Sequence, residues 1–323
     1  MRPLGRVLVT GAAGFAGSHA LDLLAAEQAT IIGWARPGAA VPQSPAVVTW
    51  RLVDVTSGAD VDRAIAQDRP DVVLHLAGDA HSNRSAAQVG KTLLVNVSGT
   101  SNVLNAIARH ARRARVIVAG SALIYSPANE PLTESSPVRP SGAYAISKLA
   151  QEMVALRAAE HDGLDVIVAR AFNHIGPRQS PEFIASSLAK QIALIETGRL
   201  EPTLFVGNLD PRRDLTDVRD MVRAYRALVD RGTRGLAYNV CRGEALSVRE
   251  LIDALVARAR GPVSVVVDPQ RVRKVDIPLV LGSHARLTSD TGWQPEVPFA
   301  RTLDDLLSYW REQVMLGTVP RAT

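Results

Sequence analysis

Short aliphatic runs alternate with amphipathic stretches through the first half of the chain. Runs of β-branched and aliphatic residues predict strands at 6–10, 30–35, 47–53, 71–77, 115–120 and 165–171. Between several of these runs, apolar residues recur three and four positions apart and predict helices around 19–27, 61–68 and 95–111. Strands that are apolar on both faces and flanked by helices indicate a parallel sheet covered on both sides. The first half therefore predicts a Rossmann-type, doubly wound α/β fold.

The pattern changes after residue 172. The segment 173–213 is rich in Gly, Pro, Asn and Arg and contains one helical pattern, for which Ser180 is the expected N-cap. We expect residues 1–172, together with about 214–242, to form the dinucleotide-binding Rossmann domain. Residues 173–213 and 243–323 are expected to form a smaller C-terminal substrate-binding lobe.

Composition places the chain among ordinary globular proteins. Its 323 residues are 46% hydrophobic and 21% charged. No run has the length of a signal-peptide core or a membrane span, so we expect no membrane partner. The single cysteine, Cys241, excludes an internal disulfide and argues against a cysteine-rich metal site. We therefore expect a cytoplasmic protein with no bound metal.

The formal net charge of +5 leaves two interpretations open. One is a solvated, Arg-rich surface, and the other is an anionic ligand such as a phosphorylated cofactor or substrate. The basic residues are scattered, and aromatic side chains, which stack on bases, make up only 4% of the chain. Nucleic acid is therefore not an expected partner.

A glycine-rich turn, GAAGFAG, follows the first predicted strand and precedes the first helix. Gly11, Gly14 and Gly17 would let the backbone approach a pyrophosphate, whose charge would sit at the positive end of the helix. Phe15 and Ala16 lie within the same predicted cofactor site. The alternative is a tight turn without a ligand.

The end of the second predicted strand bears on the choice of cofactor. NAD sites place an acidic residue there for the ribose diol, whereas NADP sites supply an arginine for the extra phosphate. Here the stretch is GWARPG, with Arg36 and no acid, which favours NADP(H) and leaves NAD(H) possible. An exposed loop arginine is the alternative. Asp54 and Val55, after the third strand, are expected to face the adenine, unless Asp54 only caps its own loop.

Tyr144 and Lys148 are four residues apart and would share one face of a helix. An ammonium beside a phenol favours the phenolate and lowers the phenol pKa, so that the phenol could exchange a proton near neutral pH. The Ser121 hydroxyl, at the end of the fifth strand, could hold the oxygen of a carbonyl or alcohol. A solvent-facing helix pair is the alternative for Tyr144 and Lys148.

Five motifs appear in family order: TGAAGFAGSH, HLAG, NVSGT, GSALIY and YAISK. With them the chain resembles an extended short-chain dehydrogenase/reductase of the nucleotide-sugar epimerase/dehydratase type. The resemblance implies that Ser121, Tyr144 and Lys148 are catalytic and that Tyr144 and Lys148 also contact the cofactor. It further implies a cofactor-proximal set: Leu76, Ala77, Gly78 and Asn96. Members of this family often dimerise through two helices, here roughly 95–111 and 143–160.

Leu123 occupies a position that often decides the chemistry in this family. Dehydratases resembling this chain carry a carboxylate there, and the enzymes that epimerise and reduce on the way to GDP-fucose carry a cysteine. A leucine cannot exchange a proton, so 4,6-dehydration and 3,5-epimerisation are disfavoured unless a carboxylate elsewhere substitutes. Reduction of a 4-ketone, or 4-epimerisation, remains.

The second half resembles GDP-4-keto-6-deoxy-D-mannose reductases in the segments 170–183, 206–220 and 272–282. This resemblance implies a set of substrate contacts in addition to Ser121: Ser82, Asn173 at the sugar or first phosphate, Lys190 at the nucleotide, Arg213 and Arg273 at the diphosphate, and Asp276 near the nucleoside ribose. Arg212, Arg219 and Arg271 are expected to be solvated or structural.

The leading expectation is an NADPH-dependent reductase that acts on the C4 ketone of a GDP-4-keto-6-deoxy-hexose and forms GDP-D-rhamnose or its C4 epimer. One alternative is a nucleotide-sugar 4-epimerase with tightly bound NAD. A second is a non-catalytic nucleotide-sugar-binding protein. We expect a homodimer.

Overall fold

The computed structural model of the chain describes residues 4–41, 47–80, 88–272 and 277–317. Three predicted substrate contacts, Ser82, Arg273 and Asp276, lie outside these residues. Within the described ranges, no helix combines the length and apolar character needed to cross a membrane. In the same ranges, no group of His, Cys, Asp and Glu side chains is placed to hold a metal ion.

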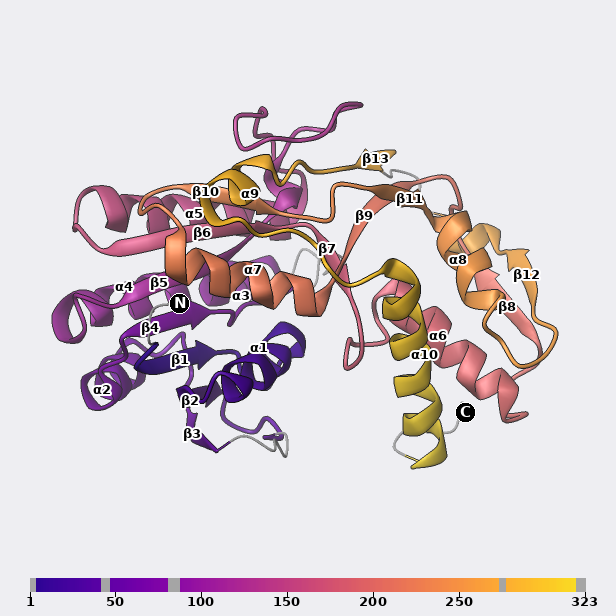
Figure 1. Ribbon diagram of the computed structural model, residues 1–323, viewed down its shortest axis with the longest axis horizontal. Coiled ribbons are helices and arrows are strands. Elements are labelled where there is room, and N and C mark those ends of the chain that lie inside the picture. The colour runs from indigo at the N-terminus through magenta and orange to yellow at the C-terminus, as the bar shows by residue number, and fades with distance from the viewer. Residues whose placement is uncertain (1–3, 42–46, 81–87, 273–276, 318–323) are drawn as a thin grey trace.

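A seven-stranded parallel sheet forms the larger part of the molecule (Figure 1). Its strands are β1 (Arg6–Thr10), β2 (Thr30–Ala35), β3 (Val48–Leu52), β4 (Val72–His75), β5 (Arg115–Ser121), β6 (Asp165–Ala171) and β10 (Ala237–Val240). They are ordered β3-β2-β1-β4-β5-β6-β10, and every neighbouring pair is parallel. This order is the Rossmann order, and it reverses direction between β1 and β4, where such sheets bind ligands. The predicted fold class is confirmed.

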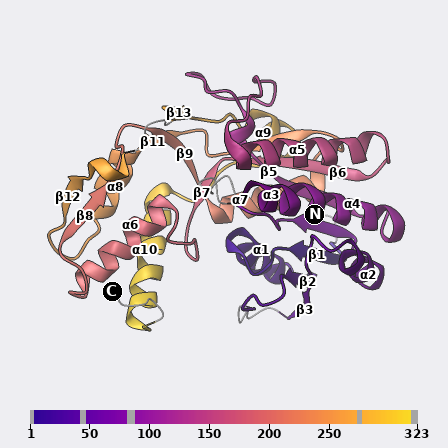
Figure 2. The ribbon, with the colours of Figure 1, turned by 180° about the vertical axis from the view of Figure 1, so that it is seen from behind.

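Helices cover both faces of this sheet, because its strands are apolar on both sides. Val7 and Val9 of β1 belong to a core shared with α1 (Phe15–Ala26), α7 (Val218–Arg231) and α9 (Ala285–Thr291). Leu8 belongs to the opposite core, shared with α2 (Gly58–Asp68), α4 (Gly99–His110) and α5 (Gly142–Glu160). The view from behind shows α4 and α5 side by side on this second face (Figure 2). The short helix α3 (Val89–Leu93) and a π-helical turn, η2 (Leu94–Ser98), lead into α4.

Two small sheets and three helices form the other part of the molecule (Figure 1). The first sheet is built around β9 (Arg212–Asp217), which pairs with β7 (Asn173–Ile175), β11 (Ala245–Ser247) and β13 (Leu279–Val280). The second joins β8 (Thr203–Val206) to β12 (Ser264–Val267). A separate core packs α6 (Ile184–Glu196), α8 (Val248–Val256) and α10 (Phe299–Met315) together. Within the range 214–242, β10 is a strand of the large sheet and α7 packs on that sheet, whereas β9, most of which lies in that range, belongs to the small sheet. The functional division into two lobes stays a prediction.

The expected N-cap of α6 was wrong. The helix begins at Ile184, and Phe183, in extended conformation, is its N-cap. The Ser180 hydroxyl instead accepts a hydrogen bond from the Glu182 backbone nitrogen at 3.3 Å. Ser180 therefore closes a local turn before the helix, which is the competing use of a serine side chain next to a helix start.

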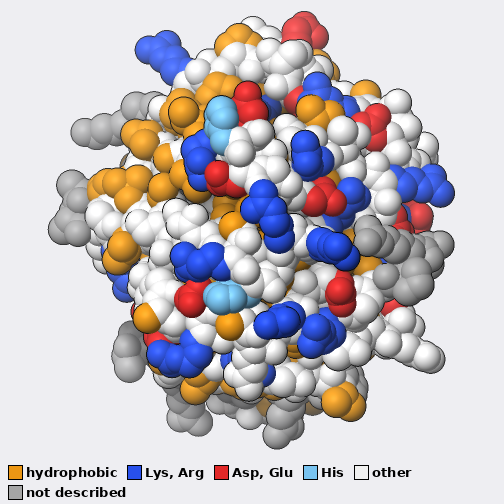
Figure 3. All heavy atoms as spheres, turned by 90° about the vertical axis from the view of Figure 1, so that its left-hand side faces the viewer, with side chains coloured by type: hydrophobic (Ala, Val, Ile, Leu, Met, Phe, Trp, Pro, Cys, Tyr) orange, Lys and Arg blue, Asp and Glu red, His pale blue; other side chains and the backbone are white. Residues whose placement is uncertain are grey.

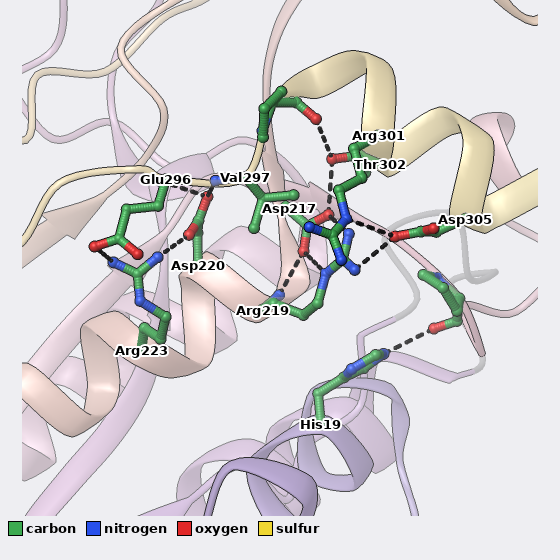
Figure 4. Close-up of polar contacts among 12 residues, drawn as sticks. His19, Asp217, Arg219, Asp220, Arg223, Glu296, Val297, Arg301, Thr302 and Asp305 are labelled. Atoms are coloured by element: carbon green, nitrogen blue, oxygen red, sulfur yellow. Dashed lines mark hydrogen bonds and ion pairs between the residues drawn. The ribbon is translucent and has the colours of Figure 1, made fainter.

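The C-terminal helix is tied to α7 by a cluster of charged groups (Figure 4). Asp217 caps α7 and accepts a hydrogen bond from the Thr302 hydroxyl of α10 at 2.7 Å. Arg219 pairs with Asp217 at 2.7 Å and with Asp305 of α10 at 2.6 Å. Arg219 therefore has the structural role expected of it. Arg212 and Arg271 also bind backbone carbonyl groups of the fold.

Candidate active site

The glycine turn between β1 and α1 brings backbone atoms too close for larger side chains. Gly11 has a φ of +67°, and a Cβ placed on it would lie 2.8 Å from the backbone nitrogen of Ala77. A Cβ on Gly17 would lie 2.2 Å from the Gly11 carbonyl oxygen. The turn is thus close to Leu76 and Ala77, in the loop that follows β4, and the two predicted cofactor segments meet.

The first turn of α1 has backbone donors without a side-chain cap. Gly14 is the N-cap, and the next residues, Phe15, Ala16 and Gly17, include no acid. Helices α2, α7 and α8 begin with a capping Ser or Asp side chain, whereas α5, α6 and α10 lack one, as α1 does, and α1 differs from these in following a glycine turn. An uncapped helix N-terminus behind a glycine turn is electropositive and suits a phosphate group. These residues therefore fit the pyrophosphate of a dinucleotide.

Arg36 lies beside this turn. The Ala12 backbone nitrogen donates to the Trp34 carbonyl oxygen at 3.0 Å, which joins the glycine turn to the end of β2. Arg36 follows two residues later and is exposed. Arg36 therefore follows β2 at the carboxyl edge of the sheet, the edge at which the glycine turn also lies.

Asp54 and Val55 follow β3 at the same edge. The Asp54 carboxylate accepts hydrogen bonds from the backbone nitrogen and hydroxyl of Thr56, at 2.9 and 2.7 Å. The loop-capping role left open by the sequence is therefore present. Asn102 of α4 donates to the Val55 carbonyl oxygen at 3.0 Å, which fixes this loop against α4. Contact of Asp54 or Val55 with an adenine stays a prediction.

Ser121 and Tyr144 meet at the end of β5. The Ser121 hydroxyl lies close enough to the Tyr144 phenol to affect the pKa of that phenol. The Ser121 hydroxyl also accepts from the Leu123 backbone nitrogen at 3.2 Å, because Ser121 is the N-cap of the 3-10 turn η3 (Ala122–Ile124). Leu123 thus orients Ser121 through its backbone, while its side chain offers no group that can move a proton.

Burial raises the pKa of Tyr144, the nearby Ser121 hydroxyl opposes that rise, and the charge of Asp79 adds to it. We expected Lys148 to lower this pKa, and that expectation was wrong, because burial raises it. A raised pKa keeps the phenol protonated at neutral pH. That is the form required to donate a proton to a ketone oxygen.

Lys148 lies one turn after Tyr144 on α5 and is 6% exposed. Its Nζ donates to the Ala119 carbonyl oxygen at 2.5 Å and to Gln151 Oε1 at 2.7 Å. Burial lowers the pKa of Lys148 to about 8, so the ammonium still predominates at pH 7. A Cβ on Gly78 would lie 4.0 Å from this Nζ, so Lys148 reaches the loop after β4.

Asn96, fully buried in η2, joins that loop to α5. Its side chain accepts from the Asp79 backbone nitrogen at 2.7 Å and donates to the Asp79 carbonyl oxygen at 3.2 Å. It also donates to the Ser147 hydroxyl at 2.9 Å, and that hydroxyl donates to the Tyr144 carbonyl oxygen at 2.7 Å. Asn96 therefore positions the Gly78 loop relative to the helix that carries Tyr144 and Lys148.

The predicted cofactor helix and the predicted substrate segment are in direct contact. Phe15 of α1 stacks on His174 of β7 with ring centroids 5.5 Å apart. His19 of α1 contacts the Pro177 carbonyl oxygen at 2.9 Å (Figure 4). Arg178 donates to His19 Nδ1 at 2.8 Å, and burial lowers the pKa of His19 to about 4, so its ring is neutral. His19 therefore donates through Nε2 and accepts through Nδ1.

The described substrate candidates lie in three places. Asn173 begins β7 and is exposed. Lys190 of α6 places Nζ 5.8 Å from the centre of the Trp310 ring. Arg213 of β9 donates to the Ile277 carbonyl oxygen at 2.7 Å, directly after the undescribed segment that holds Arg273 and Asp276. A shared nucleotide-sugar contact for these residues stays a prediction.

Tyr125, four residues after Ser121, is structural. Its hydroxyl donates to Asn239 Oδ1 at 2.7 Å and accepts from Arg170 Nη1 at 2.6 Å. Burial raises the pKa of Tyr125 to about 12. Arg170 forms a buried double contact with Glu152 of α5, at 2.6 and 3.0 Å.

Sequence reasoning missed the groups behind the predicted catalytic set: His75, Asp79, Thr100, Ser147 and Gln151. Gln151 follows Lys148 by three residues on one helix, and that spacing could have identified it. His75 and Thr100 lie within the HLAG and NVSGT motifs, but only the fold shows that they meet.

The sequence of this chain is similar to the sequences of known nucleotide-sugar enzymes. A sequence model of the NAD dependent epimerase/dehydratase family matches residues 7–241. GDP-6-deoxy-D-mannose reductase of Pseudomonas aeruginosa is 36% identical over 312 residues, which are 96% of this chain and 98% of that protein.

Two solved structures show the same arrangement of the whole chain. The structure of RMD from Pseudomonas aeruginosa complexed with NADPH superimposes with a TM-score of 0.82 at 34% identity, covering 95% of this chain and 99% of that one. UDP-glucose 4-epimerase of Thermus thermophilus in complex with NAD gives a TM-score of 0.83 at 28% identity, with the same coverage of 95% and 99%.

Proposed function

Because this chain belongs to the NAD dependent epimerase/dehydratase family, we propose that it is an NADPH-dependent reductase of a nucleotide-linked 4-keto sugar. Its substrate is a GDP-4-keto-6-deoxy-hexose, which it reduces at C4 to GDP-D-rhamnose or the C4 epimer. Similarity to a GDP-6-deoxy-D-mannose reductase along almost the full length of both proteins supports this choice.

One observation carries the proposed reaction. The Ser121 hydroxyl lies close enough to Tyr144 to lower the pKa of its phenol, and Leu123, two residues after Ser121, has a side chain that cannot serve as an acid or a base. The nearby Asp79 accepts a hydrogen bond from the Thr92 hydroxyl at 3.0 Å and is 7% exposed, so it is held within the fold. Among the described residues around Ser121, Tyr144 is the proton donor that we assign to the reaction, and reduction of a ketone requires one such donor.

In the proposed mechanism, the glycine turn and the α1 N-terminus hold the pyrophosphate, and Arg36 binds the 2′-phosphate. When bound, the reduced nicotinamide supplies the hydride. Ser121 donates a hydrogen bond to the C4 ketone oxygen and fixes its position. Tyr144 delivers its phenolic proton to that oxygen, while the Lys148 ammonium stabilises the phenolate that remains.

Asn173, Lys190 and Arg213 bind the nucleotide sugar in this proposal, together with Ser82, Arg273 and Asp276. Asn173 directly precedes His174, which stacks on Phe15 at the start of the cofactor helix. Sugar and cofactor would therefore be held by neighbouring segments, one in each of the two proposed lobes.

The cofactor preference is tested at Arg36. Arg36→Ala is expected to raise KM for NADPH about tenfold and KM for NADH less than twofold, because one charge-assisted phosphate contact of about 1.4 kcal/mol is lost. Steady-state kinetics with both cofactors measure this change. Arg234→Ala is the control, since Arg234 is exposed and precedes β10, at the opposite edge of the parallel sheet. Equal effects of Arg36→Ala on the two cofactors would remove Arg36 from the phosphate site.

The 4-epimerase alternative differs from the reductase in its use of cofactor. An epimerase recycles bound NAD, whereas a reductase consumes one NADPH for each sugar. The purified protein is therefore expected to release less than about 0.1 mole of NAD per mole of chain on denaturation, because a reductase must exchange its cofactor in every turnover. Stoichiometric NAD, with C4 epimers interconverted without added reductant, would replace the reductase proposal with the epimerase.

We also infer a homodimer formed by the α4 and α5 face. Ile146 and Met153 of α5 are 50% and 64% exposed and lie seven residues apart, on one face of the helix. Figure 3 shows hydrophobic side chains gathered along the side of the molecule that carries α4 and α5. The double variant Ile146→Glu/Met153→Glu is expected to sediment as a monomer and the native chain as a dimer. A native chain that sediments as a monomer would refute the inference.

We assign the protein to the cytoplasm. Cys241 is buried and free, as a reducing compartment permits, and burial raises the pKa of its thiol.

A further inference from the structure

A buried amide, Gln151, contacts the Lys148 ammonium directly. Gln151 is 1% exposed and lies one helical turn after Lys148 on α5. Its Oε1 accepts from Lys148 Nζ at 2.7 Å, and the Ala119 carbonyl oxygen accepts a second bond at 2.5 Å. Within the part of the chain that the structure describes, these two acceptors fix two of the three ammonium donors. The Gly78 loop lies beside the same Nζ.

The orientation of the Gln151 amide is fixed by what lies behind it. Its Nε2 lies 2.8 Å from the Thr100 hydroxyl, and that hydroxyl donates its own hydrogen to the Asn96 carbonyl oxygen at 2.7 Å. Thr100 can therefore only accept from Gln151, which places the amide NH₂ at Thr100 and the amide oxygen at Lys148. An ammonium can only donate, so the contact with Lys148 requires the same amide orientation as the contact with Thr100.

The chain of hydrogen bonds continues to the glycine turn. His75 Nε2 lies 2.9 Å from the Thr100 hydroxyl, and His75 Nδ1 lies 2.8 Å from the Thr10 hydroxyl. Burial lowers the pKa of His75 to about 3, so the ring is neutral. His75 then donates through Nε2 and accepts from Thr10 through Nδ1. The Thr10 hydroxyl accepts in turn from the Ala77 backbone nitrogen at 3.1 Å.

We propose that Gln151 is a positioning residue that fixes the Lys148 ammonium, one helical turn after Tyr144, without neutralising its charge. A carboxylate at position 151 would pair with Lys148 and screen the charge that acts on the phenol. An apolar side chain would leave the ammonium with one fixed acceptor. The neutral amide, held by Thr100, keeps the second acceptor for the ammonium and adds no charge that would screen it. This inference rests on the proposed catalytic role of Lys148.

The other ionisable groups described near Lys148 are neutral, pair with each other or, in the case of Asp79, accept a hydrogen bond from a hydroxyl. Tyr144 is protonated, and His75 on β4 is neutral, as its pKa of about 3 requires. Asp79, in the loop after β4, accepts from Thr92. Glu152 on α5 and Arg170 on β6 bind each other. A charge introduced at position 151 would therefore act on Lys148 more directly than any of these groups.

The test is a direct titration of Lys148 in the cofactor-free protein. The sequence contains four lysines, Lys91, Lys148, Lys190 and Lys274. Protein labelled with ¹³C at the lysine ε-carbon would therefore give four signals. The signal that disappears in Lys148→Arg is the signal of Lys148. The native Lys148 is expected to titrate near the pKa of about 8 that burial imposes, well below the ordinary lysine value.

Two variants then change the contact in opposite directions. Gln151→Glu is expected to raise the Lys148 pKa by roughly one to three units, and Gln151→Met is expected to lower it by several tenths of a unit. The alkaline limb of the pH profile of kcat/KM for NADPH should move with the Lys148 pKa. In Gln151→Glu, kcat should fall about tenfold, a change equivalent in free energy to one pKa unit. Gln67→Glu, on the exposed face of α2, adds the same charge and should change none of these values.

An unchanged Lys148 titration in both Gln151 variants would overturn the proposal. If Gln151→Glu does not fold, Gln151→Met decides alone, because it adds no charge and preserves the approximate shape. The titration needs neither cofactor nor sugar, so failure of the GDP-sugar proposal would leave its result unaffected.

Discussion

Tyr144→Phe is expected to lower kcat about a thousandfold while leaving NADPH affinity and thermal stability nearly unchanged. The variant removes one hydroxyl, the proposed proton donor, and positioned general acids contribute about 10²–10⁴-fold to rate. Ser121 keeps the contact from the Leu123 backbone nitrogen at 3.2 Å in the variant. Steady-state kinetics with the 4-keto sugar, and cofactor titration by fluorescence, measure the two quantities separately.

Tyr125→Phe is the matched control, because it also removes one phenolic hydroxyl, from a tyrosine that lies four residues after Ser121 and has a structural role. Asn239 and Arg170 would each lose a buried hydrogen-bond partner, so a destabilisation of about 1–3 kcal/mol is expected with kcat reduced less than tenfold. A Tyr144→Phe enzyme as active as the native one would refute the proposed mechanism. A similar loss of kcat in both variants would show that folding, and not proton transfer, had been measured.

Glu152→Leu is expected to cause the largest loss of stability, about 3–5 kcal/mol. Glu152 and Arg170 are 4% and 7% exposed, and they make two hydrogen bonds at 2.6 and 3.0 Å. The leucine would leave a buried guanidinium without its counter-charge, and removal of one partner of a buried ion pair costs more than replacement of both. The double variant Glu152→Leu/Arg170→Leu is therefore expected to recover part of the loss.

Urea unfolding followed by circular dichroism gives the midpoints that check this prediction. Arg157 lies on the same helix as Glu152 and forms an exposed ion pair with Asp162, so Arg157→Ala is the control for loss of an ion pair. It should lower the free energy of unfolding by less than about 1 kcal/mol. Equal midpoints for Glu152→Leu and Arg157→Ala would contradict the assignment of Glu152 to a buried structural pair.

Local patterns were enough to predict six of the seven strands of the large sheet, all except β10. The runs at 6–10, 30–35 and 165–171 coincide with β1, β2 and β6, because a strand buried on both faces is apolar along its whole length. The glycine turn was also predictable, since Gly11 and Gly17 lie where any Cβ would meet backbone atoms.

The second sheet was not predictable in this way. β7, β11 and β13 contain three, three and two residues, too few to show a period, and they pair with β9 across long sequence separations. Ser180 shows a related limit. The same serine oxygen can cap a helix or close a turn, and only the backbone of Phe183 shows where α6 begins.

In the site, sequence reasoning identified the groups expected to react and missed the groups that hold them. Ser121, Tyr144 and Lys148 belong to motifs of fixed spacing, and their mutual proximity follows from the fold. The contact of Gln151 with Thr100, and of Thr100 with His75, joins α5, α4 and β4. Such contacts depend on how the helices pack on the sheet. For the same reason, the sequence could not show that burial raises the Tyr144 pKa.

Hydride transfer from NADPH to C4 of a GDP-4-keto-6-deoxy-hexose is the step on which the proposed function depends. A direct experiment supplies GDP-4-keto-6-deoxy-D-mannose with NADPH deuterated at nicotinamide C4 and locates the deuterium in the product by NMR. We expect one NADPH oxidised per sugar, deuterium at C4 of the sugar, and a single C4 configuration, rhamno or talo. No oxidation of NADPH or NADH, or C4 epimers formed without consumption of reductant, would contradict the proposed function.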